Sequence, residues 1–204
     1  AYFDCFSGAS GDMILGACLG AGLAIDDLRK DLAGLRIEGY QLEATPVRKQ
    51  GFAATQFDIQ LDPAAHKPHR HLKHIREIVE ASSLPQRVRD RALDIFTRLA
   101  EAEAAVHGTA VEKVHFHEVG AIDSIVDIVG VAVGFDLLGA DLIISSSVPT
   151  GRGQVKIDHG ICTVPTPGTV ELLKGIPLVD VPVEAELTTP TGAAFLSTLV
   201  HRFG

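Results

Sequence analysis

Residues 122–138 constrain the fold more than any other stretch of the chain, because as a helix they would be apolar on nearly every side. Such a helix must be covered all round by other elements, so we expect it to be buried. Asp123 and Asp127 stand near its start, four residues apart and therefore on one face. Charge inside so apolar a helix is costly unless another group satisfies it. We therefore expect these two carboxylates to have partners.

Helical and strand patterns alternate along the rest of the chain. Short apolar or period-two runs predict strands at 1–6, 40–44, 57–61, 111–119 and 142–148. Helical spacing and start signals predict helices at 13–23 with Ser10 as N-cap, from Asp26, at 71–81, from Ser83 to Gly108 with a Ser83/Gln86 capping box, and from Thr191. This interleaving predicts an α/β or α+β fold, in which helices pack on a mixed sheet around one main core.

The chain is long enough for a single domain over 1–204, with a possible subdivision near 62–70, where two prolines stand among mixed charges. Its sequence starts without Met inside a predicted strand and stops directly after an apolar helical pattern. We therefore expect it to be a piece of a longer polypeptide.

Composition excludes several classes of protein. The 18 basic and 26 acidic residues give a net charge of −8, which does not favour nucleic acid as a partner, because phosphate binding needs a basic surface. The three cysteines are odd in number and widely spaced, which favours a reducing cytoplasm over a disulfide framework. No run is apolar enough to span a membrane, and no basic, apolar leader opens the chain.

The strongest polar cluster lies between 115 and 127. His115 and His117 are two apart on a predicted strand, so their imidazoles would share a face, and Asp123 and Asp127 follow on the next helix. Imidazoles and carboxylates at such a junction are suitable ligands for a divalent metal ion. The alternative is structural: His117 and Glu118 would cap the helix, while the two aspartates would bond to neighbouring backbone.

Two further groups are candidates for metal binding. His69 and His71 stand at the entry to the predicted helix at 71–81, where the alternative is a solvated basic segment. Asp4 and Asp12 flank a glycine-rich turn, which fits a site for a metal ion and a phosphate, although a purely structural turn is an alternative.

Two predicted helix N-termini offer free N–H groups that suit anions. The first is at Ser10 and Gly11, and the second is at Thr189 and Thr191. Neither matches a Walker A loop or a dinucleotide-binding glycine motif. Capping alone would also explain the hydroxyl residues at the second.

Four motifs together resemble the LarC family of nickel-insertion proteins: YFDCFSGASGDM at 2–13, HRHL at 69–72, HFHEVGAIDSIVDI at 115–128 and ELTTPTGA at 186–193. The resemblance implies a nickel chelatase, which places nickel into pyridinium-3,5-bisthiocarboxylic acid mononucleotide and so makes the nickel-pincer cofactor of lactate racemase. It also implies the use of CTP with manganese or magnesium, cleaved to CMP and pyrophosphate. Family proteins continue past residue 204, and CTP binding is attributed mainly to that C-terminal region.

The resemblance gives the candidate residues a target. Nickel(II) accepts imidazole and carboxylate, so His115, His117 and a neighbouring acid are expected to hold it. A nickel–carbon bond requires loss of a ring proton, for which His117, Glu118 and Asp123 are the candidate bases. The anionic groups of the substrate suit the helix N-termini at Ser10 and Thr189.

Two other functions are compatible with the same residues. One is a nickel-binding or delivery module without catalysis of its own, and the other is a metal-dependent phosphohydrolase built on Asp4 and Asp12. As partners we expect the mononucleotide substrate, the C-terminal region and a second copy of the chain, with neither nucleic acid nor membrane among them.

Overall fold

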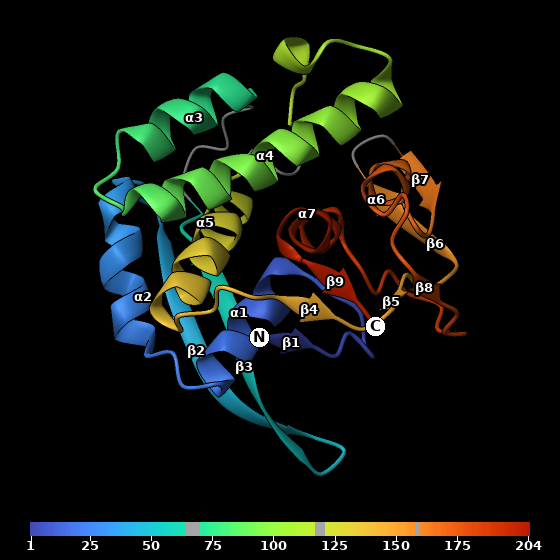
Figure 1. Ribbon diagram of the computed structural model, residues 1–204, viewed down its shortest axis with the longest axis horizontal. Helices are drawn as coiled ribbons and strands as arrows, with labels where there is room; N and C mark the ends of the chain where they lie inside the picture. Colours follow the sequence, from blue (N-terminus) through green and yellow to red (C-terminus); the bar gives the residue numbers. More distant parts are fainter. Residues whose placement is uncertain (64–69, 117–120, 158–159) are drawn as a thin grey trace. The chain divides into compact units, whose positions relative to one another are not determined.

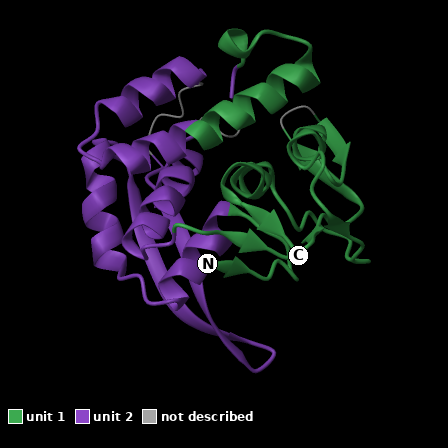
Figure 2. Ribbon diagram, in the orientation of Figure 1, with its two compact units in different colours: residues 1–10, 94–114, 141–204 green, residues 11–93, 115–140 purple. Residues whose placement is uncertain are grey.

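The computed structural model describes residues 1–63, 70–116, 121–157 and 160–204. Two compact units divide the chain (Figure 2). Unit 1 contains 1–10, 94–114 and 141–204, and unit 2 contains 11–93 and 115–140. Helices and strands alternate along the sequence (Figure 1), which confirms the predicted mixed α/β class. The possible subdivision near 62–70 stays a prediction, since 64–69 lie outside the described residues.

Unit 2 contains a long β-hairpin, the antiparallel pair β2 (Tyr40–Lys49) and β3 (Phe52–Leu61). The register runs from Tyr40 opposite Leu61 to Lys49 opposite Phe52. Gln50 and Gly51 make the turn with φ values of 50° and 90°. This left-handed conformation is easiest for glycine, which explains why Gly51 ends the hairpin. Both strands and their turn were predictable from period-two alternation.

Four helical elements of unit 2 build its core: α1 (Gly11–Gly20), α2 (Ile25–Leu32), the 3₁₀ turn η1 (Ala33–Leu35) and α5 (Ile122–Leu137). Helices α1 and α5 pack on each other and on β3, while α2 packs on α5. Helix α5 is buried along almost its whole length, as its apolar sequence predicts. Asp26 is inside the first turn of α2 and is not its cap, because the helix begins two residues earlier than predicted, directly after Ala24.

Helix α3 (Leu72–Glu80) belongs to unit 2, and the long helix α4 (Gln86–His107) contributes residues to both units. The predicted capping box at Ser83 is wrong. Helix α4 begins at Gln86, and the carbonyl oxygen of Pro85 accepts the first two helical hydrogen bonds. Gly108 follows the helix with a φ of 61°, which confirms its predicted place at the C-terminus.

Unit 1 contains a parallel three-stranded sheet in the order β1 (Tyr2–Phe3), β4 (Ile144–Ser145), β9 (Arg202–Phe203). The predicted strand at 1–6 is therefore shorter than expected, because a turn begins near Cys5. Helix α7 (Pro190–Leu199) packs beside helix α6 (Pro167–Leu172), and the rings of Phe3 and Phe195 meet edge to face with centroids 5.5 Å apart.

Two further strand pairs complete unit 1. Strands β5 (Val148–Pro149) and β8 (Leu178–Val179) are parallel, and β6 (Gln154–Ile157) and β7 (Gly160–Thr163) form a hairpin. The single strand predicted at 142–148 is thus two short strands. Ser146 and Ser147 separate them. The backbone carbonyls of these two residues accept hydrogen bonds from serine hydroxyls: Ser145 donates to the carbonyl of Ser146, and Ser146 donates to the carbonyl of Ser147.

The predicted strand at 111–119 is wrong in its described part. Residues Val111–Lys113 form the 3₁₀ turn η2, and Phe116 makes only an isolated antiparallel bridge with Arg70. Alternating apolar residues led to the prediction of a strand. Val114 and Phe116 are indeed buried, but the backbone that carries them is a loop. Residues 117–119 lie outside the described part of the chain.

None of the helices among the described residues is long and apolar enough to cross a membrane.

Candidate functional site

Three carboxylates gather in unit 2, where the first turns of α1 and α5 meet. Asp12 lies in the first turn of α1, and Asp123 and Asp127 lie in the first two turns of α5. Asp123 and Asp127 lie four residues apart on α5, and the charge of Asp123 contributes to the raised pKa of Asp127, which agrees with the predicted common face. Asp123 Oδ1 also accepts a hydrogen bond of 2.9 Å from the backbone N–H of Ser124.

Of the three carboxylates, Asp127 is in the environment that least favours its charged form. One of its oxygens, Oδ1, is shielded from solvent and has no hydrogen-bond partner among the described residues. Burial, and after it the charges of Asp12 and Asp123, together raise the pKa of Asp127 from 3.8 to about 8. In the absence of a cation, the side chain is therefore mostly protonated at neutral pH. A bound cation would offset both causes of the raised pKa.

Gly11 leaves the space into which Asp127 fits. A Cβ atom built on Gly11 would lie 2.7 Å from the Cβ, Cγ and Oδ2 atoms of Asp127. No side chain is tolerated there without displacing the carboxylate. Gly11 thus acts through close packing, and the part of an anion-binding backbone that the sequence predicted for it stays a prediction.

A second group in unit 2 consists of imidazoles. The antiparallel bridge between Arg70 and Phe116 places His71 beside His115, with ring centroids 3.9 Å apart. The ring of His74 lies 5.5 Å from that of His71. His71 is the N-cap of α3, and His71 and His74 satisfy each other's backbone N–H groups in a capping box. This capping box at α3 was not predicted from the sequence, and it is distinct from the Ser83/Gln86 box expected for α4.

Several predicted ligands cannot be placed. His69, His117 and Glu118 lie outside the described residues. In the part of the chain that is described, no three His, Cys, Asp or Glu side chains are already arranged to hold a metal ion. His115 lies in a loop, so the shared strand face predicted for His115 and His117 is wrong for its described member.

Unit 1 holds the other predicted residues. Asp4 is exposed after β1, where its charge contributes to the raised pKa of buried Cys5, whose main cause is burial. Ser10 lies beside the N-terminus of α7, because a Cβ on Gly192 would be 2.9 Å from the Ser10 nitrogen. Thr189 caps α7: its hydroxyl accepts a 3.2 Å hydrogen bond from the N–H of Gly192.

The same segment is tied to the loop after β1 by backbone pairing. The N–H of Ala9 donates to the carbonyl of Leu187 and the N–H of Thr189 donates to the carbonyl of Ala9, both at 3.0 Å. The structure therefore brings Ser10 and Thr189, which belong to two separate sequence motifs, close together. Thr191 lies in the first turn of α7. Their use in binding anions stays a prediction.

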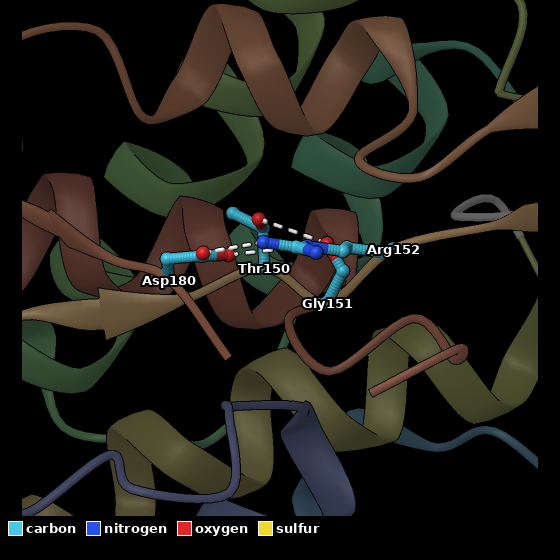
Figure 3. A network of polar contacts seen from close by, with 4 residues as sticks. All are labelled: Thr150, Gly151, Arg152 and Asp180. Atoms are coloured by element: carbon cyan, nitrogen blue, oxygen red, sulfur yellow. Dashed lines mark hydrogen bonds and ion pairs between the residues drawn. The ribbon is translucent and has the colours of Figure 1, made fainter. Parts of the chain in front are cut away.

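A polar network connects residues 149–152 with Asp180 and with the residues that precede Thr189 (Figure 3). Arg152 donates two hydrogen bonds to the Asp180 carboxylate, one of them 3.1 Å from Nε to Oδ1. Thr150 accepts at its carbonyl oxygen from the N–H of Leu187, at 3.1 Å. The buried Thr188 hydroxyl donates to the carbonyl of Pro149 at 2.6 Å. These contacts fix the backbone from which Thr189 caps α7.

Sequence reasoning did not anticipate the meeting of His71 with His115. The usable signal is that both tripeptides, HRH at 69–71 and HFH at 115–117, alternate histidine with another residue. Such alternation places both histidines of an extended tripeptide on one face. It does not tell which two segments pair.

Carboxylates and imidazoles are the side chains with which proteins bind divalent ions of borderline softness, so the site points to the class of metal-handling proteins. Comparison with protein families defines the class further. The sequence model described as "Nickel insertion protein" matches residues 1–204. The chain belongs to the nickel insertion protein family.

Curated relatives support this assignment. A putative nickel insertion protein of Citrifermentans bemidjiense is 52% identical over 204 residues, which are 100% of this chain and 53% of the relative. A pyridinium-3,5-bisthiocarboxylic acid mononucleotide nickel insertion protein of Desulfitobacterium hafniense strain DCB-2 is 50% identical, over 100% of this chain and 50% of the relative. The chain spans about half the length of the curated relatives it matches. No solved structure matches it.

Proposed function

We propose that this chain is the N-terminal domain of a nickel chelatase, which inserts Ni(II) into pyridinium-3,5-bisthiocarboxylic acid mononucleotide to make the nickel-pincer cofactor of lactate racemase. Support comes from the family match over the whole chain and from a relative, 50% identical, whose name contains this substrate. The nickel ion is here a substrate of the reaction.

One observation of the structure supports metal binding in this chain: a carboxylate, Asp127, is shielded from water beside two other carboxylates, Asp12 and Asp123. Such a site repels further negative charge and favours a cation. We assign Asp12 and Asp127 to metal binding. The further candidate ligands are His69, His71, His115 and His117, and in unit 1 Asp4. A divalent ion would replace the proton of Asp127 and lower the repulsion among the three carboxylates.

The chemistry needs a base as well as a metal. When nickel bonds to the ring carbon, the C–H bond breaks and its proton must pass to an acceptor. Asp123 is the candidate among the described residues, because it stands near Asp127 on α5 and its Oδ1 accepts a hydrogen bond from the backbone N–H of Ser124. His117 and Glu118 are the candidates outside the described residues.

The substrate's phosphate and thiocarboxylates need positive or hydrogen-bonding partners. Ser10 and Gly11 before and at the start of α1, and Thr189 and Thr191 at the start of α7, are our candidates. The dipole of a helix favours anions at its N-terminus. CTP with manganese or magnesium is assigned to a further, C-terminal region, and the assembled protein is proposed to work in the cytoplasm as a homo-oligomer.

The test uses the complete protein that contains this chain. It is incubated with Ni(II), CTP, Mg(II) and the mononucleotide, and the product is examined by mass spectrometry. We expect the mass of nickel to be gained and the ring proton to be lost. Asp127→Asn should lower the rate by at least about tenfold, equivalent to about 1.4 kcal/mol of transition-state stabilisation.

Asp94→Asn is the matched control, because Asp94 is an exposed carboxylate on α4. Equal rates in the Asp127→Asn variant and the wild type would remove Asp127 from the metal site. If the complete protein binds nickel and leaves the mononucleotide unchanged, the delivery function is correct and the chelatase function is wrong.

A further inference from the structure

The outer half of the β2–β3 hairpin is not covered by the helices that pack on its base. Near the base, Leu42 and Phe57 are buried. Residues 52–54 of β3, toward the turn, are exposed instead. Figure 2 shows this end of the hairpin extending away from the rest of unit 2. We call residues 46–54 the hairpin tip, and its side chains are available to a partner.

The hairpin tip carries apolar side chains in contact with water. Phe52 is 78% exposed, the largest fraction among the large apolar side chains of the described residues. The register places Phe52 opposite Lys49 and Ala54 opposite Val47, so these four side chains share one face. Nearer the base the same face is polar, with Gln41, Glu43, Gln56, Asp58 and Gln60. An apolar projection of this kind indicates a contact surface.

The charge of the hairpin tip selects the class of partner. Its charged residues are Arg48 and Lys49, which are both basic and exposed. Without these two, the chain has 16 basic and 26 acidic residues, a net charge of −10. The tip is thus a basic and aromatic projection on an acidic molecule, and its complement is an acidic surface. A second copy of the chain supplies one, whereas a nucleic acid or an anionic membrane would repel the rest of the chain.

Unit 1 has an exposed surface of the complementary kind at residues 178–184. The exposed large apolar residues there are Leu178, Val179 and Val183. The charged residues of this segment, Asp180 and Glu184, are both acidic and exposed. Arg152 already donates two hydrogen bonds to Asp180 (Figure 3), so Glu184 is the better partner for a basic residue of the tip.

We propose that the hairpin tip of one copy docks on residues 178–184 of a second copy, with Phe52 against the apolar side chains and Lys49 beside Glu184. In a two-fold symmetric pair the contact occurs twice, because each copy contributes one tip and one acidic surface. The inference rests on the proposed function only in giving a surface to its homo-oligomer, and it requires neither nickel nor the mononucleotide.

Cross-linking in the complete protein that contains this chain tests the contact. Isotope-labelled and unlabelled copies are mixed in dilute solution, concentrated without metal and treated with a carbodiimide, which joins a lysine amine to an adjacent carboxylate. We expect a peptide pair that joins Lys49 to Glu184 and combines a labelled with an unlabelled copy. The inference is wrong if this pair is absent while other lysine–carboxylate pairs form, or if it joins residues of one copy only.

Sedimentation velocity of the metal-free complete protein measures what the tip contributes to association. Phe52→Ser should weaken association by at least about tenfold, because an aromatic anchor at the centre of the contact is lost. Ile161→Ser is the matched control, since Ile161 is 72% exposed on β7, outside both surfaces, and its removal should change nothing. Association that is equal in Phe52→Ser and wild type would overturn the interface.

Charge exchange tests the pairing of Lys49 with Glu184. Lys49→Glu and Glu184→Lys should each weaken association, and the double variant, which exchanges the two charges, should regain most of the loss. Lys30→Glu, at an exposed lysine of α2, is the control and should associate as the wild type does. A double variant that associates no better than the weaker single variant would overturn the choice of residues 178–184.

Two other occupants of the tip have their own outcomes. Binding of monomeric protein to vesicles of anionic phospholipid, lost in Phe52→Ser, would make the partner a membrane and the inference wrong. Cross-links from Lys49 to the C-terminal region alone would also contradict it. If the tip variants lose association and the wild type inserts nickel, both proposals stand. If the wild type associates through the tip and leaves the mononucleotide unchanged, only the proposed function is wrong.

Discussion

Asp127 is held in a state that differs from that of an ordinary aspartate, and this has a consequence for stability. Its pKa is raised from 3.8 to about 8, chiefly by burial. The folded protein therefore keeps a proton that the unfolded chain releases near pH 4. The stabilisation is complete below that pH, falls as the pH rises from about 4 to about 8, and is lost above that range.

We therefore expect Asp127→Asn to remove part of the pH dependence of stability. One proton corresponds to a slope of at most about 1.4 kcal/mol per pH unit, and asparagine cannot ionise. Denaturant unfolding of metal-free protein at pH 5, 7 and 9 measures the slope. The same slope in the variant and the wild type would show that Asp127 ionises normally.

Gly11 permits a second test at the scale of a residue. Gly11→Ala should lower the free energy of unfolding by about 1–3 kcal/mol, because the new Cβ would press on Asp127. Gly20→Ala is the control in the same helix, since its Cβ would lie 3.7 Å from Thr55 Oγ1, an ordinary contact. Equal effects of the two substitutions in thermal or denaturant unfolding would contradict the close packing at Gly11.

At the scale of elements, the cap of α7 gives a prediction for unit 1. Thr189→Ala removes the acceptor of the Gly192 N–H and should cost about 1 kcal/mol of stability, while Thr189→Ser should keep most of it. Denaturant unfolding of the two variants measures the difference. If serine is as destabilising as alanine, the hydroxyl is not the source of the stabilisation.

Local pattern was sufficient for the elements whose environment is uniform along their length. Helix α5 is apolar on nearly every side, and the strands of the β2–β3 hairpin alternate apolar and polar residues, so both were predictable. The apolar pattern gave the wrong secondary structure where a tertiary contact determines the backbone conformation. Val114 and Phe116 alternate as in a strand, yet Phe116 pairs only with Arg70, which is distant in sequence.

The same limit applies to the candidate site. The shared face of Asp123 and Asp127 follows from helical spacing and was predictable. The approach of Asp12 to Asp127, and of His71 to His115, depends on which elements pack together, and a single sequence does not contain that information in local form. The family resemblance indicated which metal the protein handles, but it did not indicate which side chains are adjacent in space.

At the scale of the whole molecule, the chain is an acidic member of the nickel insertion protein family that spans about half the length of its curated relatives. Its net charge of −8 attracts cations in general. Selective handling of one metal must come from particular ligands, and the two groups in unit 2 differ in kind: three carboxylates around Asp127 and three imidazoles around His71.

Proton release on nickel binding tests the central claim, that a divalent ion takes the place of the proton on Asp127. Calorimetric Ni(II) titrations at pH 7, in two buffers of different ionisation enthalpy, give the number of protons released. With a pKa of about 8, Asp127 is mostly protonated at pH 7, so the wild type should release about one proton more than Asp127→Asn. Equal proton release and equal affinity in the two proteins would contradict the account.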